Sequence, residues 1–272
     1  MNGGYLEDMC CDINRNNFDS IWLEIDSSCK SCYTKFQNLP LKEKKGIREH
    51  IKPALTEAIL DHHFPSQRIK EKLKKLGFKG TAEYFGNYLP INDKTRKGNF
   101  GEVVTSEHLC QRYNYKMPVF KLRFMDNPNM PMRGEDIVAF EINEDTKITA
   151  ICIGETKTLE IYSKDKVKKA YEQLVKAHHS QPTSLSLICN ILYERGEDDL
   201  AKQIDEILET LALKPFPRHD WIFIITGNKP GDPFGSIEEM DSVVENLRTV
   251  SLCLPQISLF INDIFKTFSI RS

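Results

Sequence analysis

The chain has 272 residues, of which 40% are hydrophobic and 28% charged, and its formal net charge is −2. This composition predicts a packed globular core, and the near-neutral charge excludes a protein that binds nucleic acid through bulk positive charge alone. No apolar run is long enough to span a bilayer, and the first residues, MNGGYLEDMCCDINRNN, do not have the pattern of a signal peptide, so we expect a cytoplasmic protein with no membrane partner.

The N-terminal part of the chain is predicted to be largely helical. Across residues 41–88, apolar residues recur at spacings of four and three, and Gly77 should help to end the second of two helices. The segment that follows, residues 90–97, is polar and rich in turn-forming residues. We therefore predict two domains, a largely helical region at residues 1–90 and a second domain at residues 91–272.

The second domain is predicted to contain both helices and strands. Residues 99–113 fit a helix, and residues 119–125, 136–142 and 148–153 have the composition of strands. The segment NEDT at residues 143–146 suits a tight turn between the last two of these strands. A hairpin is therefore expected in the middle of the domain.

The rest of the chain continues this alternation. A helix is predicted at residues 164–179, followed by an apolar run at 184–192 and an acidic helix at 197–213. A buried strand at 221–226, a further helix at 237–247 and an apolar tail at 257–268 come next. Such an order is typical of an α/β fold in which helices cover both faces of a mixed sheet.

Charged residues stand at the ends of two otherwise apolar strands. Asp136 begins the segment DIVAF, while Glu155 and Lys157 follow ICIG on the next strand. Charge in such a position costs free energy unless it is paired or bound to a cation. Side chains two residues apart on a strand share a face, and a hairpin would bring the start of one strand beside the end of the other. We therefore expect the two carboxylates and the ammonium group to converge.

Such a trio suits metal-dependent hydrolysis of a phosphodiester. Asp136 and Glu155, together with the backbone carbonyl of Thr156, would hold Mg²⁺ or Mn²⁺ through hard oxygen ligands. The bound ion would lower the pKa of a water molecule, and Lys157 would orient or polarise that water. The non-functional interpretation is a charge pair at a solvated end of the sheet.

A glutamate on the preceding helix is the expected fourth member of the site. Glu102 stands beside Gly98 and Gly101, which would allow a close approach of this helix to the sheet or to DNA. Glu107, on the same helix, is the alternative to Glu102.

If DNA is the substrate, local basic segments or a partner must deliver it, because the net charge is slightly negative. Two runs are candidates, RIKEKLKKLGFK at residues 68–79 and KDKVKK at residues 164–169. Either run also fits the solvated face of a helix.

At these residues the sequence also resembles a known family, the HamA-type nuclease subunits of Hachiman anti-phage defence systems, with the related AbpA proteins. The segments that carry the resemblance are KGNFGEVVTSEHL, FKLRFMDNPNMPMRGEDIV and ICIGETKT, within residues 97–158. The resemblance implies a restriction-endonuclease-like PD-(D/E)XK core in residues 91–272, a Mg²⁺-dependent DNA nuclease activity, and a superfamily 2 helicase subunit (HamB-like) that restrains and targets the nuclease. Matched position by position, it implies catalytic roles for Glu102, Asp136, Glu155 and Lys157.

The roles of two further residues stay undecided in this comparison. The residue before Asp136 is Glu135, where many relatives of this fold have proline, so Glu135 can compete as a metal ligand. Gln173, on the helix after the second charged strand, either contacts substrate or belongs to a plain amphipathic helix. As alternatives to a defence nuclease, the sequence leaves a restriction-type endonuclease and a non-catalytic scaffold that docks a helicase.

Overall fold

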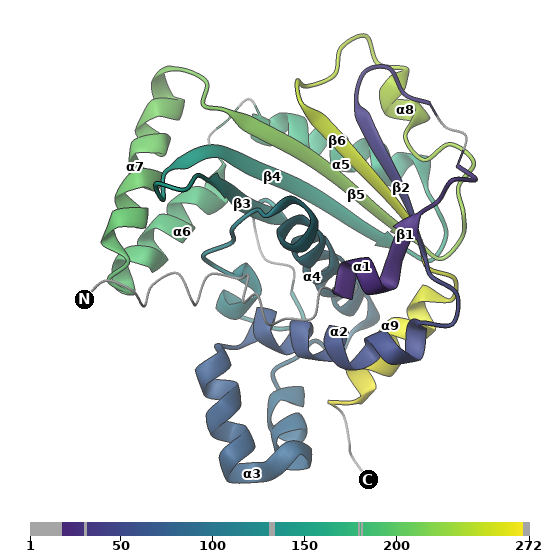
Figure 1. Ribbon diagram of the computed structural model, residues 1–272, viewed down its shortest axis with the longest axis vertical. Coiled ribbons are helices and arrows are strands. Elements are labelled where there is room, and N and C mark those ends of the chain that lie inside the picture. Colours follow the sequence, from purple (N-terminus) through teal and green to yellow (C-terminus); the bar gives the residue numbers. More distant parts are fainter. Residues whose placement is uncertain (1–17, 30–31, 131–133, 179, 181, 269–272) are drawn as a thin grey trace.

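A six-stranded mixed sheet forms the centre of the protein (Figure 1). The computed structural model describes residues 18–29, 32–130, 134–178, 180 and 182–268. The strand order across the sheet is β1-β2-β6-β5-β4-β3, in which β2, β6, β5 and β4 run parallel and the two edge strands run antiparallel to their neighbours. The strands are β1 (Leu23–Ile25), β2 (Gln37–Glu43), β3 (Ile137–Ile142), β4 (Ile148–Leu159), β5 (Arg218–Thr226) and β6 (Leu247–Cys253).

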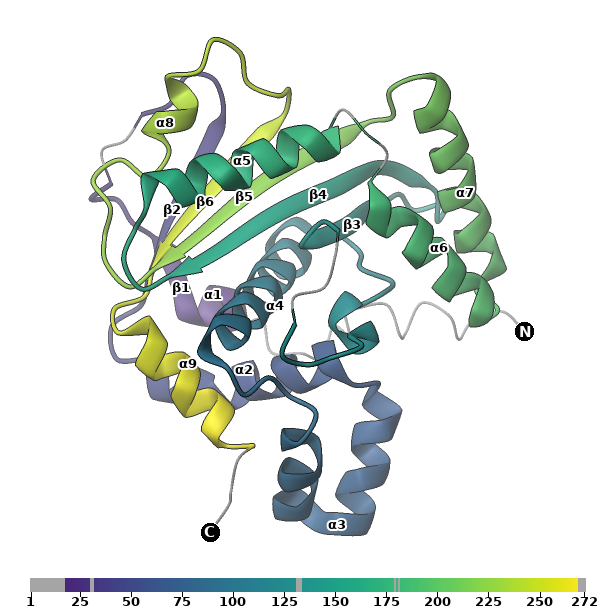
Figure 2. The same ribbon diagram turned by 180° about the vertical axis from the view of Figure 1, so that it is seen from behind.

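Helices cover both faces of the sheet (Figures 1 and 2). Alternate residues of β5 point to opposite faces, so Phe223 packs in one apolar cluster with α4 and α9, and Ile224 packs in a second with α5, α6 and α7. The predicted α/β fold with a mixed sheet flanked by helices is therefore confirmed. The helices are α1 (Phe18–Trp22), α2 (Arg48–His63), α3 (Ser66–Gly86), α4 (Asp93–Tyr113), η1 (Lys121–Phe124), α5 (Lys164–His178), α6 (Thr183–Glu194), α7 (Asp198–Leu213), α8 (Gly235–Glu238) and α9 (Ile257–Lys266).

Helix α4 includes the helix that was expected at residues 99–113, but it begins earlier. The side chain of Asn92 accepts a hydrogen bond from the Thr95 N–H at 2.8 Å and so caps the start of the helix. The helix ends where Asn114 adopts a left-handed conformation, with φ of 58°. The helix begins at Asp93, which extends it by about 1.7 turns, and this extension forms part of the candidate site described below.

Two predicted elements are wrong. Residues 119–125, expected as a strand, contain the 3-10 helix η1. Arg123 in this segment donates hydrogen bonds to the carbonyl oxygen of Asp61 at 2.7 and 2.9 Å, so contacts with a distant part of the chain stabilise the observed conformation. Residues 237–247, expected as a helix, contain only part of the short helix α8, and the apolar segment that follows is the strand β6.

The sheet includes two strands from the N-terminal region, β1 and β2. β2 pairs in parallel with β6, from Gln37 opposite Arg248 to Lys42 opposite Cys253. Residues on both sides of position 90 therefore contribute to one sheet. The division of the chain at that position stays a prediction.

Helix α3 projects away from the sheet (Figure 2). A sharp bend at Gly77, where φ is 65°, divides it into two helical segments that lie side by side (Figures 1 and 2), and glycine adopts this conformation readily because it lacks a Cβ atom. Next to the bend, Leu76 and Phe78 are 47% and 76% exposed. Among the described helices, neither this one nor any other is long and apolar enough to cross a membrane.

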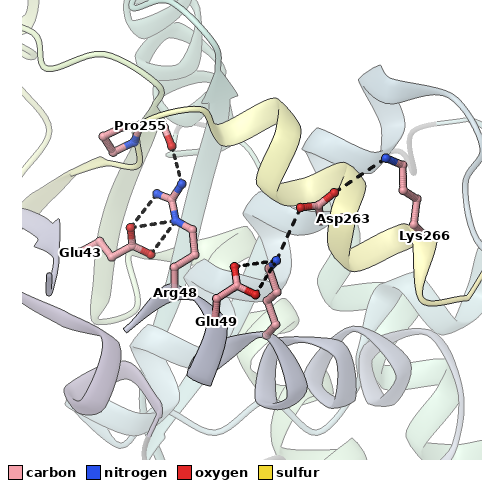
Figure 3. Close-up of polar contacts among 7 residues, drawn as sticks. Glu43, Arg48, Glu49, Pro255, Asp263 and Lys266 are labelled. Carbon is pink, nitrogen blue, oxygen red and sulfur yellow. Dashed lines mark hydrogen bonds and ion pairs between the residues drawn. The ribbon is translucent and has the colours of Figure 1, made fainter. Parts of the chain in front are cut away.

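Ion pairs connect α2 to β2 and to α9 (Figure 3). The Arg48 guanidinium of α2 contacts the Glu43 carboxylate of β2 at 2.6 Å and donates to the carbonyl oxygen of Pro255 at 2.7 Å. Lys52, one turn further along α2, pairs with Asp263 of α9 at 3.5 Å. Because α2 and α9 also pack against α4, these contacts help to hold α4 in place beneath the sheet.

Candidate active site at the open end of strand β4

Strand β4 continues beyond the end of its pairing with β3. The hairpin pairs Ile137 with Gly154 at this end, whereas pairing of β4 with β5 continues to Leu159. Residues 155–159 therefore have one edge that no described strand covers. A cavity of about 1100 Å³ opens along this edge, and β4, the start of α4 and helix α5 form its walls.

Asp136, Glu155 and Lys157 come together at this edge. The Lys157 ammonium nitrogen lies 3.2 Å from Glu155 Oε2 and 3.6 Å from Asp136 Oδ2. Asp136 Oδ2 also accepts a hydrogen bond from the Thr156 N–H at 2.9 Å. Alternation along β4 accounts for the first contact, and the register of the hairpin accounts for the others. Glu155 is only 5% exposed, so its charge is largely removed from water.

Glu102 lies on the α4 wall of the same cavity. Close packing of α4 against β4 brings it there. The packing is close at Gly101, where a Cβ atom would overlap the Thr158 hydroxyl and crowd the Thr156 hydroxyl. One turn further along α4, the Thr105 hydroxyl donates to the Thr156 hydroxyl at 3.2 Å. The close approach expected at this glycine is therefore an approach to the sheet.

At the edge of β4, the carboxyl groups of Glu102, Asp136 and Glu155 outnumber the one ammonium group that pairs with carboxylates there, that of Lys157. Burial, followed by repulsion from Asp136, raises the pKa of Glu155 to about 8, and the same two causes raise the pKa of Glu102 to about 8. Burial lowers the pKa of Lys157, but the carboxylates of Asp136 and Glu155 outweigh this effect and raise its pKa above the usual value. A divalent cation bound at the carboxylates would relieve the repulsion.

The oxygen donors at this edge fit a hard divalent cation. The N–H and C=O groups of one strand residue point to the same side of the strand. Because the Thr156 N–H points to Asp136, the Thr156 carbonyl also faces the open edge. Two carboxylates and one carbonyl are ligands that Mg²⁺ accepts, with water or substrate completing its shell. Within the described ranges, no group of three or more His, Cys, Asp or Glu side chains is arranged to hold a metal ion, so a cation here would depend on the two carboxylates together with the carbonyl and water or substrate.

Glu107, the alternative to Glu102, is directed away from the cavity. Its side chain is buried, with one carboxylate oxygen 2.8 Å from His62 Nε2. The other oxygen accepts a hydrogen bond from the Gln111 amide at 2.8 Å. The structure thus gives Glu107 partners within the core and leaves Glu102 on the cavity wall.

Glu135, the possible competing ligand, also has a structural partner of its own. Its carboxylate accepts hydrogen bonds from the N–H groups of Thr183 and Ser184, at 3.2 and 3.0 Å, at the start of α6. Burial raises the pKa of Glu135, but these donors together outweigh burial and lower the pKa below its usual value. Glu135 thereby anchors the chain next to Asp136 and is not among the described residues that line the cavity.

Helix α5 contributes amide and basic side chains to the cavity. Gln173 lines it, as do Lys166, Lys169 and Lys176. Of the two basic runs in the sequence, the run on α5 therefore reaches the cavity with two of its lysines, whereas the run at residues 68–79 lies on α3. Lys176 was not singled out from the sequence, although its spacing from Gln173 and Lys169 places all three on one helix face.

A family model and a curated relative match this chain. The family model is described as HamA and matches residues 13–268. The relative is the "Hachiman protein HamA" of Bacillus cereus, which is 33% identical over 141 residues. The match covers 51% of this chain and 49% of the relative, so the chain spans about half the length of the curated relative that it matches.

Proposed function

The chain belongs to the HamA family, and we propose that it is a metal-dependent DNA nuclease that acts as the effector of an anti-phage defence system. The name of the Bacillus cereus relative, a Hachiman protein, supports the defence role. The observation that carries the nuclease assignment is the convergence of Asp136, Glu155 and Lys157 at the open edge of β4. Their position in a large cavity leaves room for a polymeric substrate.

Each of these groups has a distinct role in the proposed reaction. Asp136 and Glu155, with the carbonyl of Thr156, would hold Mg²⁺ or Mn²⁺. When bound, the ion supplies a water of lowered pKa and offsets the charge of the phosphate. Lys157 stays protonated because the neighbouring carboxylates raise its pKa. Its ammonium group would therefore donate a hydrogen bond to the attacking water or to a phosphate oxygen.

Glu102 would act from the opposite wall. Its raised pKa, about 8, means that it holds a proton near neutral pH in the metal-free protein. In that state its carboxyl group can donate a hydrogen bond. With a cation at the edge of β4, the ionised form would be favoured and Glu102 would serve as a further ligand, directly or through water.

We further propose that a superfamily 2 helicase subunit binds the N-terminal region and restrains the nuclease. The exposed apolar tip of α3, at Leu76 and Phe78, supports this proposal because exposed aromatic residues commonly anchor protein partners. Deletion of residues 1–90 would also remove β1 and β2 from the sheet. Substitution at the tip of α3 is therefore a sharper test of the interface than deletion.

Metal dependence tests the proposed function. The purified chain, alone and with its partner subunit, would be incubated with plasmid DNA in Mg²⁺, in Mn²⁺ and in excess chelator. We expect cleavage with either ion, no cleavage in chelator, and recovery of cleavage when Mg²⁺ is added back. Undiminished cleavage in excess chelator would contradict the proposal.

A further inference from the structure

Besides Lys157 on β4, five lysines line the cavity, on two of its walls. Lys166, Lys169 and Lys176 lie on α5 and are called the α5 lysines here. Lys94 and Lys97 lie at the start of α4 and are called the α4 lysines. The spacing of the α5 lysines, three and then seven residues, places them on one helix face. The acidic edge of β4 therefore lies in a cavity with positive charge on both walls.

These five ammonium groups form no ion pair with any described carboxylate, whereas the neighbouring Lys164 pairs with Glu239 at 3.3 Å. Glu172 is the one acidic residue that α5 adds to the described cavity lining. A cleft lined by charge of one sign concentrates ions of the opposite sign. The walls therefore favour a polyanion although the chain as a whole has a net charge of −2.

The row of α5 lysines is long enough to follow several phosphates. From Lys166 to Lys176 the helix advances about 15 Å, at about 1.5 Å per residue. Along B-DNA, the phosphates of one strand advance about 3.4 Å per nucleotide, so the row is about as long as four base-pair steps. Gln173 lies between Lys169 and Lys176 and adds an uncharged donor and acceptor to the same face. A single phosphate or a mononucleotide would leave most of this row unused.

We propose that the α5 lysines bind the phosphates of a DNA strand that runs along this helix, while the α4 lysines bind phosphates from the opposite wall. The inference rests on the proposed nuclease function, because it places the phosphate to be cut at the acidic edge of β4. The lysines position the strand and take no part in the chemical step. Because phosphates carry no base identity, this binding is independent of DNA sequence.

The test is a salt titration of DNA binding. A short fluorescein-labelled DNA duplex would be titrated with the full chain in chelator, so that no strand is cut, and its fluorescence anisotropy would be measured over a series of salt concentrations. For the variant Lys166→Gln/Lys169→Gln/Lys176→Gln, the slope of log affinity against log salt should become shallower by roughly 2 to 3, since each lost phosphate contact removes roughly 0.9. Its affinity at low salt should fall at least about tenfold.

A matched control removes the same charge outside the cavity. Lys147, Lys202 and Lys214 are exposed and are not among the described residues that line the cavity. The variant Lys147→Gln/Lys202→Gln/Lys214→Gln should keep the wild-type slope. Both triple variants should melt near the wild-type temperature, because exposed lysines contribute little to stability.

A third variant addresses the competing basic run on α3. Lys70→Gln/Lys74→Gln/Lys75→Gln removes three exposed lysines from that helix, and it should also keep the wild-type slope. The inference is overturned if either comparison variant flattens the slope as much as the α5 variant, or if the wild-type chain does not bind the duplex at low salt.

The two proposals can fail separately in these experiments. If the α5 variant flattens the slope as expected but the wild-type chain cuts no DNA with Mg²⁺, the lysine surface is supported and the nuclease assignment fails. If the wild-type chain cuts DNA with Mg²⁺ but the α5 variant binds with an unchanged slope, the nuclease assignment is supported and the lysine surface fails.

Discussion

Replacing Glu155 by Gln should stabilise the metal-free protein. Burial and the nearby Asp136 carboxylate raise the pKa of Glu155 from 4.5 to about 8. The folded protein therefore holds a proton that the unfolded chain releases at neutral pH. This proton uptake lowers the free energy of unfolding by about 1.4 kcal/mol for each pH unit above the unfolded pKa. The total at about pH 7 is roughly 3 kcal/mol.

The net gain is smaller than this cost, because the amide introduced by the substitution is itself a buried polar group whose hydrogen bonds must be satisfied. We expect Glu155→Gln to stabilise the protein by about 1 to 2 kcal/mol and to raise its Tm by about 2 to 6 °C. A raised carboxyl pKa destabilises the folded state only above the unfolded pKa. The advantage of the variant should therefore be largest at about pH 8 and should disappear as the pH falls towards about 4.5.

Thermal unfolding in excess chelator, over this pH range, measures the effect. Glu144 is exposed in the turn between β3 and β4, so Glu144→Gln is a matched control that should leave Tm unchanged at every pH. Addition of Mg²⁺ should stabilise the wild-type protein more than the variant, because the ion binds the ionised carboxylate. A variant that melts below the wild type in chelator near neutral pH would refute the charge-repulsion account, as would a gain that is independent of pH.

Three further predictions concern packing, capping and assembly. Gly101→Val should lower the free energy of unfolding in urea by about 1 to 3 kcal/mol, because the valine side chain would overlap threonine hydroxyls of β4. At Gly98 an added Cβ meets nothing within 4 Å, so the control Gly98→Ala should be neutral or stabilising. Equal stability of the two variants would contradict this prediction. Glu135→Ala should cost about 1 to 2 kcal/mol by removing the acceptor at the start of α6. Its Mg²⁺ requirement for half-maximal cleavage should stay unchanged, and an increased requirement would identify Glu135 as a ligand after all. Phe78→Ser on α3 should abolish co-purification with a helicase subunit. The control Leu213→Ser, at another exposed apolar residue, should leave co-purification unchanged. If Phe78→Ser still co-purifies with the helicase subunit, the tip of α3 is excluded as the interface.

Features that depend on local pattern could be predicted from the sequence. A turn at NEDT with alternating strands on either side is sufficient to bring Asp136 beside Glu155, and the two-residue spacing brings Lys157 to the same face. β6 shows the limit of this reasoning, because it lies between β2 and β5, which come from distant parts of the chain. The local sequence therefore predicts a helix at residues 237–247, although the structure has only the short helix α8 before β6.

Contacts between distant residues also decided which acidic side chains face the cavity. Glu102 and Glu107 both lie on α4, and helix periodicity alone does not choose between them. The choice follows from His62, which contacts Glu107 within the core, and from the packing of Gly101 on β4. Glu135 is likewise engaged by the start of α6, more than forty residues further along the chain.

Plasmid cleavage by Glu155→Ala/Lys157→Ala is the most direct test of the central claim that this edge of β4 is a nuclease active site. The control Glu144→Ala/Lys147→Ala removes the same two charge types from the turn at the other end of the hairpin, where both residues are exposed. The active-site variant should show no cleavage above background in Mg²⁺ and should melt at or above the wild-type temperature, while the control should cut at the wild-type rate. Cleavage by Glu155→Ala/Lys157→Ala at near the wild-type rate, or a loss of activity that only follows a loss of folded protein, would contradict the claim.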